Sequence, residues 1–514
     1  MESGKPDTVP AFLAAAKAAL VDRGRVLPYR ALELESASLA RGLRERGVRA
    51  GDRVALWLPS IAAWLATFAA CCRLGAIAVS LNTRFRSAEI EDIVSRSGCK
   101  ALVYWPDFRG IDFRGILSAC DPAALDGLGA RIAYGEDYDE LAKLPPLEDD
   151  ASSPDAPCIV FTTSGTTKAP KFVLHDQKTL LRHARDVARD FRFVEDGTKV
   201  LVTAPLCGVF GFCNAMAAIA ADKPLVMTPT FNASEAAGLV RSHGITHFNC
   251  TDEMIAQMLA AEPDDAALRS IRFVGYAAFN PALADLPARA AARGLTVVGL
   301  YGSSELQALL ARQGEDAPPE ERGLAGGKLV AAQGQVQARD PEGGARQPHG
   351  TPGELVFKAP SRMVGYFGDP AATRQATTAD GWFRSGDLGY TLADDRFVFL
   401  TRLGDAMRLS GFLVSPGEIE ETLLEHAQVH AAQVVAVETP GGPRPFAFVI
   451  LRPGQTLDEA AILAHCAARM AKYKLPIGVQ ALTEFPVTPG ANATKIQRGK
   501  LREMAREWVA GLQG

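Results

Sequence analysis

Hydroxyl and lysine side chains are concentrated in one stretch, Phe161–His175, which reads FTTSGTTKAPKFVLH. An apolar run (PCIVF) leads into it, so the pattern predicts a strand that feeds a turn. In such a turn, N–H and O–H groups can bind polyphosphate oxygens and lysine can neutralise charge. The residues concerned are Thr162, Thr163, Ser164, Gly165, Thr166, Thr167, Lys168 and Lys171. The turn is not a Walker A loop, because GxxxxGK[ST] is absent, and its composition alone also fits a plain solvated turn.

A second group of candidate residues follows the predicted strand Leu295–Leu300 and reads Tyr301-Gly302-Ser303-Ser304-Glu305. Ligands of open α/β sheets bind at the carboxyl ends of strands. The tyrosine ring could stack on a base, and Glu305 could hold a hard cation such as Mg²⁺. A strand-to-helix turn capped by serines would have the same composition.

Two further candidates lie nearer the C-terminus. Asp387 sits between glycines in GWFRSGDLG, where its carboxylate can accept two hydrogen bonds from a ribose diol. An aspartate beside glycine is also an ordinary turn residue. Lys495 begins the basic stretch KIQRGKLRE, and a lysine in such a tail is by itself usually a surface charge.

Taken in order, these motifs resemble those of the adenylate-forming superfamily, which includes acyl- and aryl-CoA synthetases, peptide-synthetase adenylation domains and luciferases. The resemblance is carried by TSGTT-x-x-P-K, YGSSE, GWFRSGDLG, TRLGDAMRLSGFLVSPGEIE and TKIQRGKLRE, and extends over nearly the whole chain. It implies that ATP, Mg²⁺ and CoA are used, that Lys495 and Lys171 are catalytic, and that Glu305 holds the metal. The nucleotide site that it implies comprises Thr163, Ser164, Gly165, Thr166, Thr167, Lys171, Ala277, Ala278, Tyr301, Gly302, Ser303, Ser304, Asp387 and Arg402.

The resemblance also assigns roles between the two expected domains. Asp387 would hold the ribose hydroxyls, and Arg402 would reach ribose and phosphate. Ser410 and Gly411 match the small pair beside which the pantetheine arm passes, and Gly404 occupies the hinge position.

Four positions depart from the family pattern. Lys168, Phe172 and Thr494 replace glycines, and Gly404 replaces a hinge aspartate or lysine. Phe172 makes positive φ costly and so stiffens the loop. Gly404 allows hinging but removes a side chain that would hold one rotational state. These departures leave open a catalytically degenerate nucleotide-binding relative.

The implied reaction converts a carboxylate into an acyl adenylate with release of pyrophosphate, and a thiol then takes the acyl group. The adenylation step needs a phosphate cradle, a cation and a positive charge that spans carboxylate and α-phosphate. The family removes its lysine afterwards by rotating the C-terminal domain. The thiol belongs to CoA or to the phosphopantetheine of a carrier protein, and the sequence leaves both open.

The acid itself is expected to be an uncharged fatty or aromatic acid. The segments that the family uses for its acyl pocket are apolar here and contain no Asp for an ammonium group and no Arg for a second carboxylate. Ala277 and Ala278 would supply small walls, and Gly208 opens space. The residues predicted to line the pocket are Gly208, Val209, Phe210, Leu300, Gly302 and Gln307.

The elements that must position these residues follow an alternating strand and helix pattern. Helices are predicted at 29–46, 64–74 and 179–191, and strands at 53–58, 76–81, 101–104 and 199–203, whereas 106–150 is predicted to be an irregular surface excursion. Short alternating runs from about residue 330 predict an antiparallel β region, and 416–512 a small α+β unit. The predicted class is α/β: a large domain (1–403) of parallel-rich sheets with a β-barrel-like subdomain, and a small mobile domain (404–514).

Composition narrows the class of protein further. The chain has 514 residues, 47% of them hydrophobic and 22% charged, which predicts a globular protein of two or more domains. A net charge of −4 favours neither nucleic acid nor an anionic membrane. The nine cysteines lack CxxC spacing, and no signal peptide or transmembrane segment is expected, which together favour a cytoplasmic location. No residue pattern decides between a monomer and a homodimer.

Overall fold

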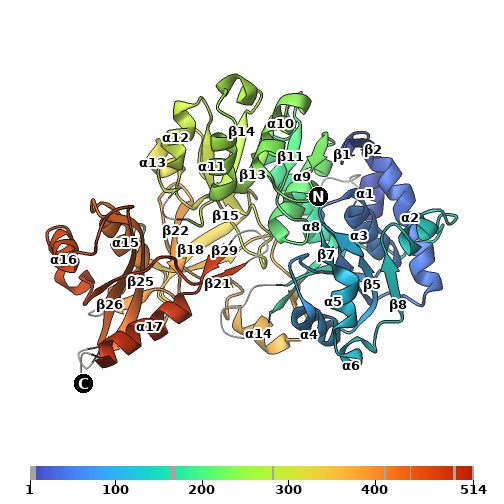
Figure 1. Ribbon diagram of the computed structural model, residues 1–514. Coiled ribbons are helices and arrows are strands. Elements are labelled where there is room, and N and C mark those ends of the chain that lie inside the picture. The colour runs from blue at the N-terminus through green and yellow to red at the C-terminus, as the bar shows by residue number, and fades with distance from the viewer. Residues whose placement is uncertain are drawn as a thin grey trace.

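The fold was analysed in a computed structural model, which describes residues 7–162, 170–280, 283–409, 412–439, 442–489 and 494–511. Two large sheets dominate the chain up to residue 402, and a smaller unit follows (Figure 1). This arrangement confirms the predicted α/β class. The domain boundary at 403/404 stays a prediction, although the last strand of the large sheets ends at Arg402 and the next strand begins at Met407.

The first sheet has seven strands and is mostly parallel. Its short strands are apolar and buried, as expected for strands covered on both faces. In spatial order they are β20 (Gly365–Tyr366), β10 (Phe172–Asp176), β9 (Pro157–Thr162), β4 (Ile77–Ser80), β3 (Arg53–Trp57), β5 (Cys99–Tyr104) and β8 (Ala130–Ala133).

The segment 106–150 departs from its prediction. It contains the helices α5 (Phe113–Ser118), α6 (Pro122–Leu125) and α7 (Asp137–Ala142), and β8 is the edge strand of the first sheet. The prediction of an irregular excursion was wrong because β8 reads Ala-Arg-Ile-Ala and is only partly buried, so it lacks the continuous apolar run that marks β4. Its position is decided by pairing with β5, about thirty residues earlier.

The second sheet has thirteen strands, of which β1, β12, β11, β13, β14 and β15 run parallel. The strands predicted as a β-barrel-like subdomain continue this sheet in antiparallel pairing from β15 onward. In spatial order the strands are β18 (Gln335–Arg339), β19 (Gly353–Lys358), β21 (Phe383–Thr391), β22 (Arg396–Arg402), β17 (Gly326–Leu329), β16 (Ala311–Arg312), β15 (Val297–Tyr301), β14 (Phe273–Ala277), β13 (His247–Thr251), β11 (Val200–Val202), β12 (Leu225–Met227), β1 (Ala19–Asp22) and β2 (Arg25–Pro28).

Helices cover both faces of each sheet. One apolar cluster joins residues of both sheets to α1 (Val9–Ala15), α2 (Tyr29–Glu45), α3 (Ala62–Leu74), α8 (Gln177–Asp190) and α9 (Val209–Ala220). The outer face of the first sheet packs on α4 (Ser87–Ser97), α5 and α6. That of the second packs on α10 (Ala233–His243), α11 (Asp252–Ala261) and α12 (Leu286–Ala292). Among the described residues, no helix is long and apolar enough to cross a membrane.

The C-terminal unit has its own apolar clusters, which begin at Met407. A three-stranded sheet packs between helices, in keeping with the α+β unit predicted for 416–512. The elements are β23 (Met407–Leu409), β24 (Phe412–Val414), α15 (Pro416–Leu424), β25 (Val429–Thr439), β26 (Gly442–Leu451), α16 (Glu459–Ala467), β27 (Val479–Ala481), β28 (Val487–Pro489), β29 (Thr494–Ile496) and α17 (Arg498–Gly511). In the view of Figure 1, β29 points from this unit toward the middle of the molecule.

Candidate active site

The carboxyl ends of three neighbouring parallel strands bring several predicted residues to one edge of the second sheet. Thr251 and Ala277 pair directly across β13 and β14, and β15 ends next to them at Tyr301. Ala277 is half-buried, whereas Ala278 and Gly302 are exposed. This edge is where an open α/β sheet binds its ligand.

Tyr301, Asp387 and Arg402 form one cluster, joined by a hydrogen bond and an ion pair. The register of β21 and β22 places Asp387 opposite Arg402, whose Nη1 lies 3.0 Å from Asp387 Oδ1. The Tyr301 hydroxyl donates to Asp387 Oδ2 at 2.6 Å. Burial raises the pKa of Asp387, and the Arg402 charge and the Tyr301 hydrogen bond oppose that rise. The neighbouring arginine thus supports a buried carboxylate that can still accept hydrogen bonds, because each carboxylate has about four acceptor sites.

The Tyr301 ring is surrounded by other aromatic side chains. Its centroid lies 5.6 Å from that of Phe357 with near-parallel planes, and 5.1 Å from that of Phe397 at a right angle. Only 7% of the residue is exposed. The ring is therefore held in a fixed position. In this structure Tyr301 contributes to the site through its hydroxyl, which contacts Asp387.

Glu305 and Lys171 meet at Tyr366, a residue of β20. The Tyr366 hydroxyl donates to Glu305 Oε1 at 2.9 Å, and Lys171 Nζ lies 4.6 Å from the centroid of its ring. Within the described ranges no three His, Cys, Asp or Glu side chains gather as a metal site. A single carboxylate nevertheless fits Mg²⁺, because this ion takes one or two protein carboxylates and fills its shell with phosphate and water oxygens.

The turn that carries Glu305 is sterically constrained. A Cβ on Gly302 would lie 2.8 Å from Ala308 Cα, so only glycine fits there. Gln307 and Leu309 adopt left-handed φ angles of 57° and 66°, which residues other than glycine rarely adopt. Strained backbone of this kind persists only where the surroundings hold it.

Two buried histidines hold this turn, and the sequence interpretation assigned neither of them a role. His175 Nε2 donates to the Ser304 carbonyl at 2.8 Å, and His183 Nε2 donates to the Ala308 carbonyl at 2.7 Å. Burial lowers the pKa of each to about 4, so both are neutral at pH 7. The sequence did contain a signal for this role. His175 lies within an apolar strand and His183 on the buried face of a helix, where a histidine needs a hydrogen-bond partner.

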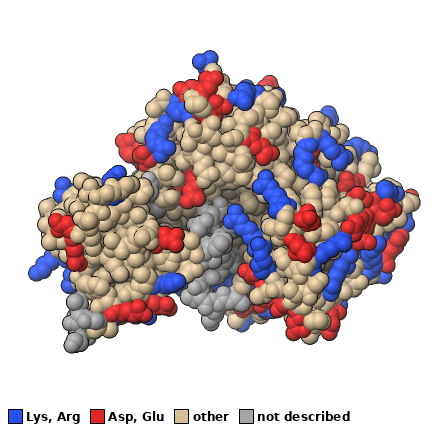
Figure 2. Space-filling model, in the orientation of Figure 1, with Lys and Arg blue, Asp and Glu red and all other residues tan. Residues whose placement is uncertain are grey.

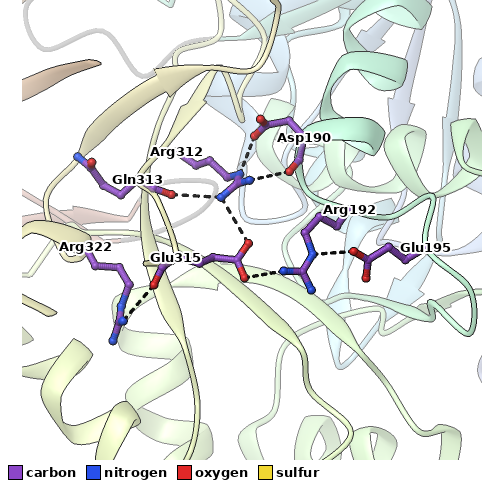
Figure 3. A network of polar contacts seen from close by, with 7 residues as sticks. All are labelled: Asp190, Arg192, Glu195, Arg312, Gln313, Glu315 and Arg322. Carbon is purple, nitrogen blue, oxygen red and sulfur yellow. Dashed lines mark hydrogen bonds and ion pairs between the residues drawn. The ribbon is translucent and has the colours of Figure 1, made fainter. Parts of the chain in front are cut away.

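A polar network fixes the chain just beyond the turn (Figure 3). Arg312 of β16 donates to Asp190 at the end of α8, with Nε 2.6 Å from Oδ2. Glu315 joins the same network through Arg192 at 2.9 Å, and Arg192 also pairs with Glu195. The helix α8 therefore fastens the chain at Ala308, through His183, and at Arg312, through Asp190.

Several residues predicted to line the acyl pocket are buried. Gly208 precedes the first residue of α9, and Val209 and Phe210 are buried in the same apolar cluster as Leu300. Gln307 is buried too, and its Nε2 donates to the Ser361 carbonyl at 3.3 Å. Ser303 is half-buried, and its hydroxyl has no hydrogen-bond partner among the described residues.

The remaining predicted residues lie near the start of the small unit. Gly404 has no atom within 4 Å of where a Cβ would stand, and its carbonyl accepts from Arg502 Nη2 at 3.1 Å. The same guanidinium pairs with Asp405. Lys495 lies in β29, where its backbone pairs with Thr488. The side chain of Lys495 lies outside the described part of the structure, as do Thr163, Ser164, Gly165, Thr166, Thr167, Ser410 and Gly411.

Phe172, one of the departures from the family pattern, lies in the first sheet. Phe172 is buried in β10, opposite Thr162 of β9, and the Arg96 guanidinium lies 4.3 Å from its ring centroid. An extended strand needs no glycine, so the phenylalanine is accommodated at this position.

Figure 2 shows Lys and Arg side chains near the middle of the molecule, on the side of the large unit, which favours an anionic ligand on that face.

Comparison with known proteins found the following similarities. A family model described as "AMP-binding enzyme" matches residues 12–367, and one described as "AMP-binding enzyme C-terminal domain" matches residues 418–491. The chain is 31% identical to a sulfoacetate–CoA ligase of Cupriavidus necator, over 93% of both chains. It is 30% identical to a feruloyl-CoA synthase of an Amycolatopsis species, over 93% of this chain and 94% of the other.

Solved structures share the fold. An anthranilate CoA ligase in complex with anthranoyl-AMP superposes with a TM-score of 0.84 at 26% identity, over 98% of both chains. ATP-bound MatB from Rhodopseudomonas palustris superposes with a TM-score of 0.86 at 23% identity, over 97% of this chain and 98% of the other.

Proposed function

This chain belongs to the AMP-binding enzyme family, and on that basis we propose that it activates an uncharged fatty or aromatic acid as an acyl adenylate and transfers the acyl group to CoA. Family membership makes it an AMP-forming ligase that uses ATP and Mg²⁺. The acid, the thiol acceptor and the residue roles are the proposed part.

The first half-reaction requires the acid and the α-phosphate to be held together. A carboxylate oxygen bonds to the α-phosphorus, and the bond from that phosphorus to the bridging oxygen breaks, so that pyrophosphate leaves with the electron pair. Asp387 would orient the ribose diol, and Arg402 would oppose the rise in the pKa of Asp387 and reach the phosphate. Glu305 would hold Mg²⁺, which would neutralise phosphate charge when bound.

The second half-reaction transfers the acyl group to sulfur. The CoA thiol gives its proton to solvent, the resulting thiolate bonds to the acyl carbon, and AMP leaves with the electron pair of the carbon–oxygen bond. Lys495, proposed to span carboxylate and α-phosphate in the first step, is not needed here. Its place on a C-terminal unit with a separate core supports a domain rotation between the steps.

The observation that carries the proposal is the cluster of Tyr301, Asp387 and Arg402 at the sheet edge. Tyr301, which lies 86 residues away in the chain, and Arg402 both contact the buried Asp387 carboxylate. The cluster of Glu305, Tyr366 and Lys171 supplies an anion and a cation nearby.

Pyrophosphate release with a panel of acids tests the function directly. We expect ATP-dependent release of pyrophosphate with an acid built on octanoic or cinnamic acid, and CoA-dependent formation of the thioester. The panel should include sulfoacetate, because the 31% identical relative is named for that acid. A preference for sulfoacetate would overturn the proposal that the acid is an uncharged fatty or aromatic one. Absence of pyrophosphate release with every acid would overturn the proposed activity.

A carrier protein is the second candidate acceptor. One relative, 29% identical over 94% of this chain, is a fatty acid–acyl-carrier-protein ligase of Streptomyces coeruleorubidus. Replacing CoA by a phosphopantetheinylated carrier in the same assay separates the two acceptors. A cytoplasmic location and a homodimer stay predictions, to be checked by cell fractionation and light scattering.

A further inference from the structure

Two asparagines form an isolated amide pair inside the large unit. Asn214 of α9 and Asn249 of β13 are both completely buried, and Asn249 Nδ2 donates to Asn214 Oδ1 at 3.0 Å. Asn214 Nδ2 and Asn249 Oδ1 have no partner among the described residues. A buried polar group without a partner destabilises the fold, so two of them side by side need an explanation.

The free hydrogen-bonding capacity does not depend on how the amides are oriented. Exchanging oxygen and nitrogen in both side chains would reverse the direction of the bond between them. Either way, the pair keeps one N–H donor and one carbonyl acceptor for a third group.

The pair lies on the same face of the second sheet as the expected acyl pocket. Phe248 and Cys250 belong to the apolar cluster of the opposite face, so Asn249 points toward α8 and α9. A Cβ on Gly275 would lie 2.3 Å from Asn249 Oδ1 and 3.0 Å from the Leu300 methyl groups. Because Gly275 has no side chain, Asn249 and the pocket residue Leu300 both pack against its backbone and lie close to each other.

The depth of the pair can be estimated from the elements that carry it. Asn214 lies six residues beyond Gly208, about 9 Å along α9 at the usual helical rise. Asn249 lies two residues before the end of β13, about 7 Å below the edge of the sheet. An acid whose carboxylate reacts at that edge would bring the far end of its acyl group to this depth.

We propose that the Asn214–Asn249 pair binds a hydroxyl group at the far end of the acid. This inference rests on the proposed function and names the substrate class. A hydroxyl accepts from Asn214 Nδ2 and donates to Asn249 Oδ1, so it satisfies both free groups at once. A charged group fits poorly, because two neutral amides do not compensate for its desolvation, and an apolar group leaves both amides unpaired.

Matched pairs of acids test this proposal. The catalytic efficiency of pyrophosphate release is compared between cinnamic and para-hydroxycinnamic acid, and between octanoic and ω-hydroxyoctanoic acid. We expect the hydroxylated member of at least one pair to be preferred by more than about tenfold, since sites built around a substrate hydroxyl discriminate strongly against its loss. The double variant Asn214→Leu/Asn249→Leu should lose that preference while still activating the acid that lacks the hydroxyl.

Cys250→Ala provides the control. Cys250 neighbours Asn249 but faces the opposite apolar cluster, so the variant should keep the preference. Nucleotide affinity and thermal unfolding of each variant show whether it is folded. Activity without a hydroxyl preference in either pair, or a preference that survives in the double variant, would overturn the inference. Absence of pyrophosphate release with every acid would instead overturn the proposed function.

Discussion

At the scale of single residues, Asp387 and Asp380 form a natural comparison. Both are aspartates paired with an arginine, but Asp387 is 2% exposed and also accepts from Tyr301. Asp380 lies on the surface, where Arg339 Nη2 approaches it to 2.7 Å. Exposed pairs contribute little, whereas a buried charge that loses its partner is costly.

We therefore predict different outcomes for two equivalent substitutions. Asp387→Asn removes the proposed ribose acceptor and the charge that positions Arg402, so the catalytic efficiency for ATP should fall by about 10²-fold or more. Asp380→Asn should leave it within about twofold. Pyrophosphate exchange at varied ATP measures both. An Asp387→Asn enzyme with the wild-type KM for ATP would contradict the assigned role.

At the scale of elements, the hinge segment shows how a missing side chain is replaced. Gly404 cannot hold a rotational state by its own side chain, as the sequence interpretation noted. In the structure Arg502 of α17 pairs with the adjacent Asp405 and also donates to the Gly404 carbonyl. The contact that steadies this segment therefore comes from its neighbour and from a helix near the C-terminus.

The strand β29 and helix α17 provide a second comparison, between Lys495 and Lys500. We predict that Lys495→Ala slows adenylate formation by about 10²–10³-fold, because a charge that is needed only in that transition state is lost. Thioester formation from a supplied acyl adenylate should be spared. Lys500→Ala, which alters an exposed side chain on α17, should affect neither step. Equal loss of both half-reactions in Lys495→Ala would refute the domain-rotation proposal.

At the scale of the whole molecule, buried neutral histidines make stability depend on pH. Burial lowers the pKa of His175, His183 and His247 to about 4, whereas an unfolded histidine titrates near 6.5. Between these values the unfolded chain binds protons that the folded chain does not. The contribution of these residues is therefore fully present above about pH 6.5 and is lost as the pH falls toward 4.

We predict that His183→Gln makes the free energy of unfolding less dependent on pH in this window. One histidine accounts for up to about 1.4 kcal/mol per pH unit. Urea unfolding between pH 7 and 4.5 measures the slope. His430→Gln, at an exposed position of β25, serves as control and should keep the wild-type slope. Identical slopes for wild type and His183→Gln would contradict the neutral, buried state of His183.

Much of the fold was predictable from local patterns. The helix predicted at 29–46 is α2, the strand predicted at 53–58 is β3, and the antiparallel region after residue 330 continues the second sheet. These elements are long or strongly apolar, so their period is visible within a few residues. The strand β8 was missed because its four residues acquire their role only by pairing with β5.

The sequence by itself determined the family, the order of the motifs and the predicted nucleotide residues, because these are carried by short strings at the ends of strands. The tertiary structure alone decided that the Tyr301 hydroxyl meets Asp387, 86 residues away. It also decided that His175 and His183 hold the Ser304–Ala308 turn, and that Asn214 meets Asn249. The physical reason is that periodicity and propensity act between neighbours in the chain. Burial and hydrogen-bond partnership depend on which distant elements pack together.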